Sequence, residues 1–486
     1  MRRRFESSVG VLLIAILAAT HMSCAVNPAT GAREFMLVSE GQEIAMGRNA
    51  DPQIVAAYGL YPDSAWQRYI RGLGEGLAAR SERPQLPWTF RVLDDPTVNA
   101  FALPGGYNYV TRGIMAYFES EAELVSVMGH ELGHVTARHG AHQMSQQQLA
   151  SIGLIATAVL LPENLQGFMG LAAGGVQIMF LGFSRSDESE ADMLGLRYMS
   201  AAQYDPYQMP KVYEMLNSVS MAASGGERLP TWLSTHPDPV DRGARILELI
   251  DSQPRPLGTT VHRDEYLARL EGMTFGQNPR EGFFREQLFL HPDLAFQLAF
   301  PAGWATQNQR SMVAAQSATK DAIMMLTLED DATSVQAAAT TFSTQEGLQS
   351  GAVTQRTVNG LASASVGFQA TLQDGTLAGE AYFIEYDQRI FRILGYSTAE
   401  AWSGYQPAFR SSAQSFNRLT EQRALNVQPL TLTIITTDRD MTLAQFSTRY
   451  PSEIAVEQLA LLNRRSSGET IPAGTRLKRV VGGPIR

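Results

Sequence analysis

The chain has 486 residues, of which 44% are hydrophobic and 18% are charged, and its formal net charge is −9. This length and composition exclude a disordered or collagen-like protein and predict two or three domains with sizeable cores. The acidic balance and the lack of a long basic run argue against a nucleic-acid partner. A single cysteine, Cys24, excludes an internal disulfide bond.

Residues 1–23 have the pattern of a signal peptide. Arg2–Arg4 are basic, and the apolar run Val9–Ala19 is shorter than the roughly 20 residues that cross a bilayer. Cys24 then follows, as in bacterial lipoprotein signals, although His21 stands where an aliphatic residue is usual. We therefore predict a lipid anchor on Cys24, and Ala25 favours the outer membrane. Ordinary secretion with an incidental cysteine is the alternative.

Residues 24–260 are predicted to be mainly helical with a short sheet. Ser39 and Ser120 each open a capping box, which predicts helix starts there, the second helix running to about His139 before Gly140. Helical spacing and alternation predict further elements. These are a helix over Asp63–Arg80, strands over Thr89–Leu93, Val98–Leu103 and Tyr107–Thr111, and helix starts at Asp205-Pro206 and Asp238-Pro239.

Two further units are predicted after this region. Residues 283–420 have few charges and strand-like pieces, which favours an α+β domain of unknown role. The pieces are Ala295–Phe300, Ala322–Leu328, Ala381–Tyr386 and Ile390–Tyr396. Residues 428–486 read as strand, helix, helix, strand and resemble a LysM module, which implies contact with peptidoglycan. A packing domain without glycan binding is the alternative.

One motif carries the chemistry. His130, Glu131 and His134 fit the pattern HExxH in the middle of a predicted helix. Positions i and i+4 share one helix face, so both imidazoles can bind one zinc ion. Glu131 can reach a metal-bound water as general base. The motif therefore predicts a zinc hydrolase, with two surface histidines on a charged helix as the alternative.

A catalytic zinc needs a third protein ligand and an open position for water. A histidine six residues after His134 is excluded, because that position is Gly140. A carboxylate on a later helix remains, and Glu188 and Asp192 are four residues apart on one face. Glu188 can bind the metal while Asp192 accepts a hydrogen bond from a ligand histidine. Taken alone, this charged run also fits a solvated helix face.

Several short motifs occur together over residues 27–250. They are Asn27–Gly31, Asn99–Gly106, His130–His134, Ser184-Arg185 with Glu188 and Ala191-Asp192, and Thr235–Pro237 with Arg242. This set resembles the gluzincin metalloproteases that include HtpX and the CaaX prenyl proteases, and among them outer-membrane quality-control proteases of the BepA type. Proteins of that type also carry helical repeats, whereas no period of about 34 residues follows residue 260. Partners bound through such repeats are therefore not implied.

The resemblance implies a fold and a set of site residues. The fold class is α+β, with a mainly helical zincin-type domain followed by the α+β domain and the LysM-like domain. His130, His134 and Glu188 would bind one zinc ion per chain, and Glu131 would be catalytic. Zinc polarises the scissile carbonyl, and Glu131 moves a proton from water to the leaving amine.

Other residues are assigned less specific roles. His236 and Arg242 are the candidates for stabilising the oxyanion. In the family the His-Pro histidine lies near the metal and can also occupy its open position. A buried structural histidine with an ordinary surface arginine is the alternative. Strand Tyr107–Thr111 is the candidate for pairing with an extended substrate. The histidines that lack metal-ligand spacing, and are predicted to be ordinary, are His139, His142, His262 and His291.

Two apolar segments, Leu149–Leu161 and Phe168–Phe183, lie between the two predicted ligand helices. Each is shorter than a transmembrane helix. We expect an apolar lid that contacts the membrane or client proteins, with a buried helical hairpin as the alternative.

The leading functional hypothesis is a zinc endopeptidase anchored through Cys24 at the periplasmic side of the outer membrane. Its substrates would be unfolded or misassembled envelope proteins. An envelope chaperone or assembly factor with a self-inhibited zinc site is the second hypothesis, and a peptidoglycan-binding protein is the third. The intact Glu131 favours the first. A soluble periplasmic or secreted protein is the alternative location.

Overall fold

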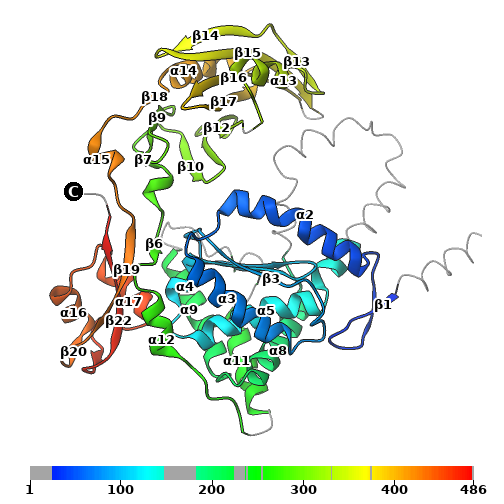
Figure 1. Ribbon diagram of the computed structural model, residues 1–486, viewed down its shortest axis with the longest axis vertical. Helices are drawn as coiled ribbons and strands as arrows, with labels where there is room; N and C mark the ends of the chain where they lie inside the picture. The colour runs from blue at the N-terminus through cyan, green and yellow to red at the C-terminus, as the bar shows by residue number, and fades with distance from the viewer. Residues whose placement is uncertain are drawn as a thin grey trace, which may run out of the picture.

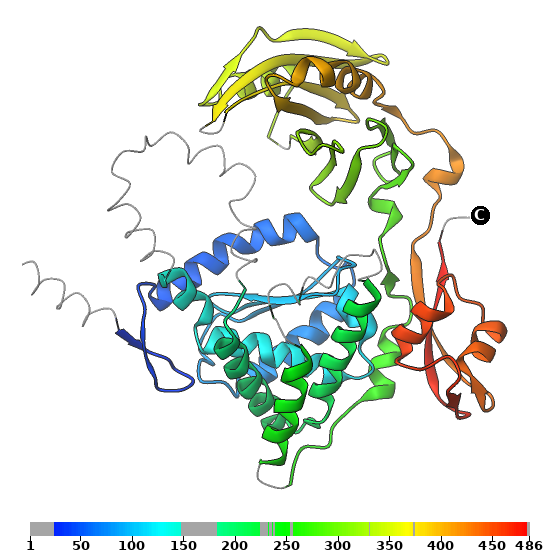
Figure 2. The same ribbon diagram turned by 180° about the vertical axis from the view of Figure 1, so that it is seen from behind.

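The structure, a computed structural model, describes residues 24–146, 182–223, 232, 236, 239–252, 256–329, 331–372 and 375–483. The predicted signal peptide and nearly all of the predicted apolar lid lie outside these residues. Figures 1 and 2 show a helical body around a short sheet, a second body built on a long antiparallel sheet, and a small C-terminal unit beside the first body. Within the described ranges, no helix is both long and apolar enough to cross a membrane.

The first body is mainly helical, as predicted. Ser39 and its partner Gln42 form the complete capping box, and Asp63 caps the next helix through the N–H groups of Ala65 and Trp66. The helices are α2 (Glu40–Tyr58), α3 (Ser64–Ala78), α4 (Arg112–Tyr117), α5 (Glu121–Thr136), α8 (Arg185–Ala201), α9 (Gln208–Ala223), α11 (Pro239–Asp251) and α12 (Arg263–Arg269).

Two predicted helix boundaries and one predicted capping box need correction. The helix expected at Asp205-Pro206 begins at Gln208, because the Asp205 carboxylate accepts the N–H of Tyr207 in a turn that precedes α9. Only half of the capping box at Ser120 forms, because the carboxylate of the third residue, Glu123, binds elsewhere. Helix α5 ends at Thr136 and not at His139.

A three-stranded sheet crosses the helical body. It consists of β3 (Thr89–Leu93), β4 (Ala100–Leu103) and β5 (Tyr107–Thr111), in the order β3-β5-β4, with β3 parallel and β4 antiparallel to β5. All three strands were predicted, but the expectation that Tyr107–Thr111 pairs with a substrate is wrong, because β5 already has a neighbour on each side. The edge strand nearest α5 is β4.

Helices cover both faces of this sheet. Ile54 of α2 packs against Phe101 and Tyr109 on one face. Val110 on the other face belongs to a larger core with the apolar residues of α5, including Leu124. Figure 1 shows α2 on one side of the sheet and α5 with α8 on the other. Ahead of the body, β1 (Cys24–Val26) and β2 (Arg33–Phe35) form an antiparallel hairpin.

The second body is an α+β unit, as predicted for this region. Tyr382 and Phe383, neighbours on one strand, belong to two different cores, one shared with α14 and one with α13, so the two helices cover opposite faces of the sheet. An antiparallel sheet contains β10 (Ala305–Gln309), β11 (Met312–Gln316), β12 (Ala322–Leu328), β13 (Leu348–Ser350), β14 (Thr354–Val358), β15 (Leu361–Leu372), β16 (Gly375–Tyr386) and β17 (Arg389–Thr398). The helices are α13 (Val335–Ser343) and α14 (Trp402–Gln414), and a smaller sheet holds β7 (Phe283–Arg285), β8 (Leu288–His291), β9 (Phe296–Ala299) and β18 (Asn417–Arg418).

The C-terminal unit has the predicted order of strand, helix, helix and strand. Its elements are β19 (Leu430–Thr436), β20 (Met441–Thr442), α16 (Leu443–Arg449), α17 (Val456–Asn463), β21 (Thr470–Ile471) and β22 (Arg476–Gly482). The sheet is not confined to this unit, since β19 also pairs with β6 (Thr274–Phe275). Leu432, Leu462 and Val480 share one core with Met115 of the helical body. The unit is therefore packed as a part of the first body.

A buried ion pair joins the C-terminal unit to the segment before α5. Lys478 is fully buried, and its Nζ donates to the carbonyl oxygens of Ala116 and Phe118 at 3.0 Å. The same Nζ lies 3.0 Å from Glu119 Oε1. Arg464 of the unit binds Glu123 in the first turn of α5. These contacts hold the start of α5 in place.

Replacing Lys478 by methionine is expected to lower the free energy of unfolding by about 1–3 kcal/mol, because the carbonyl oxygens of Ala116 and Phe118 would lose their donor and Glu119 would keep only Arg263 as a cationic partner. The double variant Lys478→Met, Glu119→Gln is expected to recover part of this loss, since the carboxylate that faced the ammonium group is then neutral. Urea unfolding followed by tryptophan fluorescence measures both. An unchanged unfolding midpoint in Lys478→Met would contradict this account of the interface.

Candidate metal centre

Glycines allow the helices that carry the two charged motifs to pack closely. A Cβ atom on Gly195 of α8 would lie 2.8 Å from the backbone nitrogen of His130, and one on Gly133 of α5 would lie 3.0 Å from the carbonyl oxygen of Ala191. Real Cβ atoms essentially never come closer than 3.0 Å to another heavy atom. The close approach brings the HExxH motif of α5 next to Glu188 of α8.

The structure brings His130, His134, Glu188 and His236 together at one point. One potential ligand atom from each lies within 4.8 Å of the others. His134 Nε2 is 3.1 Å from His130 Nε2 and 3.4 Å from Glu188 Oε1, and His236 Nδ1 is 2.8 Å from the same carboxylate oxygen. All four side chains are at most 3% exposed. Three imidazoles and a carboxylate that converge in this way form a donor set suited to a metal such as zinc.

Burial and neighbouring charges shift the pKa of Glu188 in opposite directions. Burial raises the pKa of Glu188, but the charge of His236 and the hydrogen bonds from His134 and His236 outweigh it and hold that pKa well below its usual range. Burial lowers the pKa of His134 well below its ordinary value. An ionised carboxylate and a neutral imidazole are the protonation states that bind metal ions, as found for Glu188 and His134. Burial lowers the pKa of His236, but the charges of Glu188 and Glu131 outweigh it and raise that pKa.

Glu131 lies beside this cluster and does not belong to the ligand set. Its Oε1 is 3.6 Å from His236 Nε2 and accepts a hydrogen bond of 3.3 Å from the indole N–H of Trp232. Burial raises the pKa of Glu131, against the charges of His236 and His130. A carboxylate with a raised pKa is a stronger base, which suits the predicted role in proton transfer.

Asp192 lies behind His130, on the side away from the other ligand atoms. His130 Nδ1 is 3.0 Å from Asp192 Oδ1, which also accepts a hydrogen bond of 2.6 Å from the hydroxyl of Tyr213. Burial raises the pKa of Asp192, but the charge of Arg242 outweighs it, so the pKa is lowered. The geometry agrees with the predicted hydrogen bond from a motif histidine to Asp192.

Arg242 is fully buried, so the alternative of an ordinary surface arginine is wrong. Its Nη1 lies 2.5 Å from Glu188 Oε2, and its Nε donates to Asp192 Oδ2 at 2.9 Å. The guanidinium also lies over the rings of Tyr213 and Trp232, at 4.6 and 5.1 Å from their centroids. Arg242 thus binds the carboxylates of Glu188 and Asp192, whereas the predicted oxyanion role needs a guanidinium that faces the substrate.

Aromatic rings cover the cluster. Trp232 stacks on His236 with ring centroids 4.5 Å apart, and Phe183, at the end of the predicted lid, stacks on His134 at 3.9 Å. Trp232 and Tyr213 were not predicted as site residues. Neither stands at a characteristic spacing from the HExxH motif, so no signal in the sequence would have identified them.

His139 is not one of the four clustered candidate ligands, in agreement with the prediction, but it contacts one of them. Its Nδ1 lies 2.9 Å from Nδ1 of His134. Its nearness in sequence to His134 was the signal that could have been followed. The other three histidines predicted to be ordinary also lie outside the four clustered candidate ligands, in agreement with the prediction. They are His142, His262 and His291.

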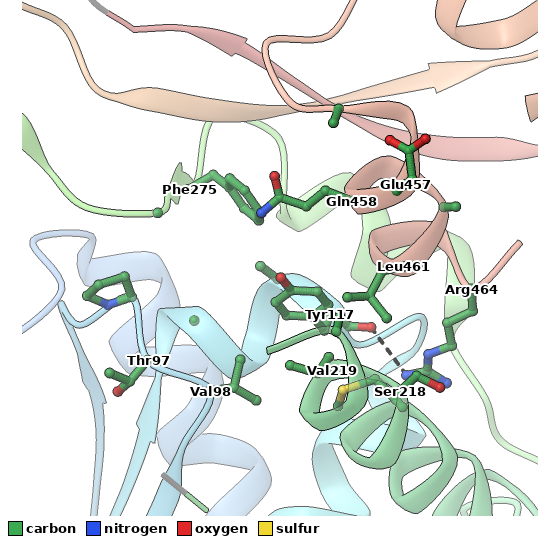
Figure 3. A pocket seen from close by; sticks show the side chains of 18 of the residues that line it. Thr97, Val98, Tyr117, Ser218, Val219, Phe275, Glu457, Gln458, Leu461 and Arg464 are labelled. Carbon is green, nitrogen blue, oxygen red and sulfur yellow. Dashed lines mark hydrogen bonds between the residues drawn. The ribbon is translucent and has the colours of Figure 1, made fainter. Parts of the chain in front are cut away.

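A large cavity lies away from these residues. It has a volume of about 1210 Å³ and runs between α9, α17 and β6, where Arg464 donates to the carbonyl of Tyr117 (Figure 3). None of the four clustered residues lines it. A cavity of only about 20 Å³ borders His134, between Leu103 at the end of β4 and Phe183. Such a space holds about one water molecule.

Comparison with known proteins places the chain in a family. Residues 64–250, which contain the four clustered residues as well as Glu131 and Arg242, match the model of peptidase family M48. The mitochondrial metalloendopeptidase OMA1 of Schizosaccharomyces pombe is 32% identical over 258 residues, which cover 51% of this chain and 72% of that protein. The chain belongs to peptidase family M48. The predicted resemblance to a metallopeptidase family is thereby confirmed.

Bacterial M48 relatives match over a shorter share of their length. The beta-barrel assembly-enhancing protease of Escherichia coli is 32% identical over 250 residues, which cover 50% of each chain. A Vibrio cholerae relative is 35% identical, with 43% of each chain covered. This chain thus spans about half the length of these relatives. The solution structure of cyanobacterial PsbP from Synechocystis is similar to 28% of the chain at 12% identity, and its TM-score of 0.23 is too low to carry an argument.

Proposed function

We propose that this M48 protein is a zinc endopeptidase that hydrolyses peptide bonds in unfolded or misassembled envelope proteins. The convergence of His130, His134 and Glu188 on one buried point, with Glu131 beside it, is the observation that carries the proposal. Membership of family M48 supports the reaction class. The name of the Escherichia coli relative, a beta-barrel assembly-enhancing protease, supports envelope proteins as the substrate class.

The chemistry follows from the placement of these side chains. His130, His134 and Glu188 would hold the zinc ion, which when bound supplies polarisation of the scissile carbonyl and a more acidic water. Glu131 accepts a proton from the attacking water and then donates it to the leaving amine nitrogen. Asp192 and Arg242 keep His130 and Glu188 oriented, so we assign Arg242 a positioning role.

Strand β4 is the proposed docking edge for the substrate. It is an edge strand of the sheet, and Ala102, Leu103 and Pro104 border the small cavity beside His134. An extended peptide added to this edge would be recognised mainly through its backbone. Cleavage would then depend on unfolding of the substrate more than on its sequence.

This dependence gives the test of the proposal. Unfolded casein and a denatured outer-membrane β-barrel protein are expected to be cleaved by the full chain, whereas the same β-barrel folded in detergent is expected to resist. Gel electrophoresis and mass spectrometry of the fragments measure cleavage. Equal rates on the folded and unfolded forms would contradict the selection of unfolded substrates. If the protein cleaves no substrate even when its site is loaded with zinc and open, the proposal itself is contradicted.

His236 supports a self-inhibited state of the same site. Its Nδ1 lies within 3.3 Å of both His130 Nε2 and Glu188 Oε1, so His236 would be a fourth protein ligand of a bound zinc ion. A saturated metal has no position for the attacking water. The second hypothesis, an assembly factor with a closed zinc site, rests on this contact. We propose that the closed site corresponds to the assembly factor and that the open site, without His236 in the ligand position, corresponds to the peptidase.

Replacing His236 by alanine is therefore expected to raise casein hydrolysis by about tenfold, because a larger fraction of molecules would hold a water in place of the imidazole. Zinc content should stay at that of the wild type, since three ligands remain. His142→Ala serves as the control, as His142 contacts Gln146 away from the cluster. A lower rate with zinc retained would show that His236 assists catalysis.

Location and anchoring complete the proposal. We place the protein at the periplasmic side of the outer membrane, with a lipid on Cys24, and this placement rests on the signal pattern of residues 1–24. The name of the bacterial relative agrees with an envelope location. Binding of peptidoglycan by residues 428–486 stays a prediction from the sequence.

A further inference from the structure

The two histidines of the HExxH motif are held from behind by different groups. His130 Nδ1 faces a carboxylate oxygen of Asp192 at 3.0 Å. His134 Nδ1 instead faces a second imidazole, Nδ1 of His139, at 2.9 Å. His130 thus contacts a carboxylate directly, whereas His134 can be connected to a carboxylate only through the ring of His139.

A break after α5 places this second ring. In an unbroken helix, residues five apart point in directions about 140° apart and do not meet. Arg138 has a left-handed backbone with φ of 64°, and helical residues resume at His139. The break turns the chain back, so that the ring of His139 packs against His134, with centroids 5.0 Å apart. His139 is 2% exposed.

The outer nitrogen of His139 faces two carboxylates of α8. Its Nε2 lies 3.7 Å from Glu190 Oε2 and 3.8 Å from Asp187 Oδ1. These distances exceed a hydrogen bond, and among the described residues this buried nitrogen has no hydrogen-bond partner. The contact is therefore electrostatic.

The N-terminal hairpin holds Glu190. Asn27, which follows β1 and is 1% exposed, donates through Nδ2 to Glu190 Oε1 and to Glu34 Oε1, both at 2.9 Å. Its Oδ1 accepts the backbone N–H of Ala29 in the turn between β1 and β2. Asn27 begins one of the short motifs found in the sequence, and these bonds connect that motif to α8.

The positions of the protons follow from these contacts. Nε2 of His134 points into the cluster, so a metal bound there requires the proton of His134 to be on Nδ1. That N–H must donate to Nδ1 of His139, which then carries its own proton on Nε2. This N–H points to Glu190 and Asp187, and their negative charge favours it.

We propose that His139 is a positioning residue for His134, and that Glu190, held by Asn27, selects the tautomer of His139. The inference rests on the proposed function in one respect, namely that His134 binds zinc. Hydrogen bonds of this kind orient a ligand histidine and make it a better donor to the metal. Carboxylates would thus support both histidines of the motif, Asp192 directly and Glu190 through a ring.

Zinc affinity tests this inference without relying on turnover. All variants are made in the full-length Glu131→Gln protein, and the dissociation constant for zinc is measured by competition with a chromophoric chelator. His139→Phe keeps a ring but removes the acceptor nitrogen, and it is expected to weaken zinc binding by about tenfold to a hundredfold. His139→Gln, whose side-chain oxygen can accept the same hydrogen bond, is expected to recover most of this loss. His142→Phe is the matched control and should bind zinc as the parent does.

The visible spectrum of the cobalt-substituted proteins gives a second measurement, because it reports the geometry of the ligands. A changed spectrum in His139→Phe and a parental one in His139→Gln support the inference. Parental zinc affinity and spectrum in a folded His139→Phe protein would overturn it. If His139→Phe does not fold, Glu190→Leu replaces it, and unchanged zinc affinity there overturns the inference equally. Failure of the parent protein to bind zinc would instead refute the proposed function.

Discussion

Replacing Glu131 by glutamine is expected to lower casein hydrolysis by about a hundredfold to ten-thousandfold while zinc stays bound. Glutamine has nearly the same shape, but its amide cannot accept a proton from the attacking water. Glu131 is not one of the four clustered candidate ligands, so its replacement leaves them in place. Steady-state cleavage of casein and the zinc content of the same sample are the two measurements.

A matched control uses the exposed Glu214 of α9, which lies outside the metal cluster. Glu214→Gln is expected to cleave casein as the wild type does. Equal turnover by wild type and Glu131→Gln would remove the peptidase proposal, because the two carboxylates nearest to it in the cluster, Glu188 and Asp192, are both bound by Arg242. The assembly-factor hypothesis would then account better for the closed cluster.

Replacing His134 by alanine is expected to reduce zinc from one ion per chain to almost none, and to abolish casein hydrolysis. His134 supplies one of the three protein ligands that remain once the site opens, and two ligands hold zinc weakly. Inductively coupled plasma mass spectrometry of the purified protein measures the metal.

Glu188→Gln provides an independent version of this experiment, since it replaces the only carboxylate among the clustered ligands. His142→Ala is again the control and should keep its zinc. The wild type, stripped by a chelator, should regain hydrolysis on addition of zinc. One zinc per chain retained in both His134→Ala and Glu188→Gln would contradict the assignment of the ligands.

The residues that contact the candidate ligands from outside explain why the two variants should lower the melting temperature by different amounts. Loss of Glu188 would also leave Arg242 buried without one of its carboxylates, whereas loss of His134 would leave His139 without its partner. Removing one member of a buried ion pair costs more than removing one member of a neutral hydrogen bond. Glu188→Gln is therefore expected to lower the melting temperature more than His134→Ala.

Local features of this protein were determined by the sequence alone. The cap at Ser39 and the i, i+4 spacing of His130 and His134 depend on contacts within a single helix. Strands such as β3 and β5 were predicted with their observed bounds, because alternation and flanking turns are also short-range signals. The same short-range logic put Glu188 and Asp192 on one face of α8.

The tertiary structure alone decided how these pieces meet. It made β5 a central strand, left β4 at the edge, and merged the C-terminal sheet with β6. It also brought His236 to the cluster from 106 residues beyond His130, and turned His139 onto His134 through the left-handed residue Arg138. Such contacts arise from the packing of whole elements and from single backbone angles. Neither leaves a periodic pattern along the chain, so these contacts could not be predicted from short-range patterns in the sequence.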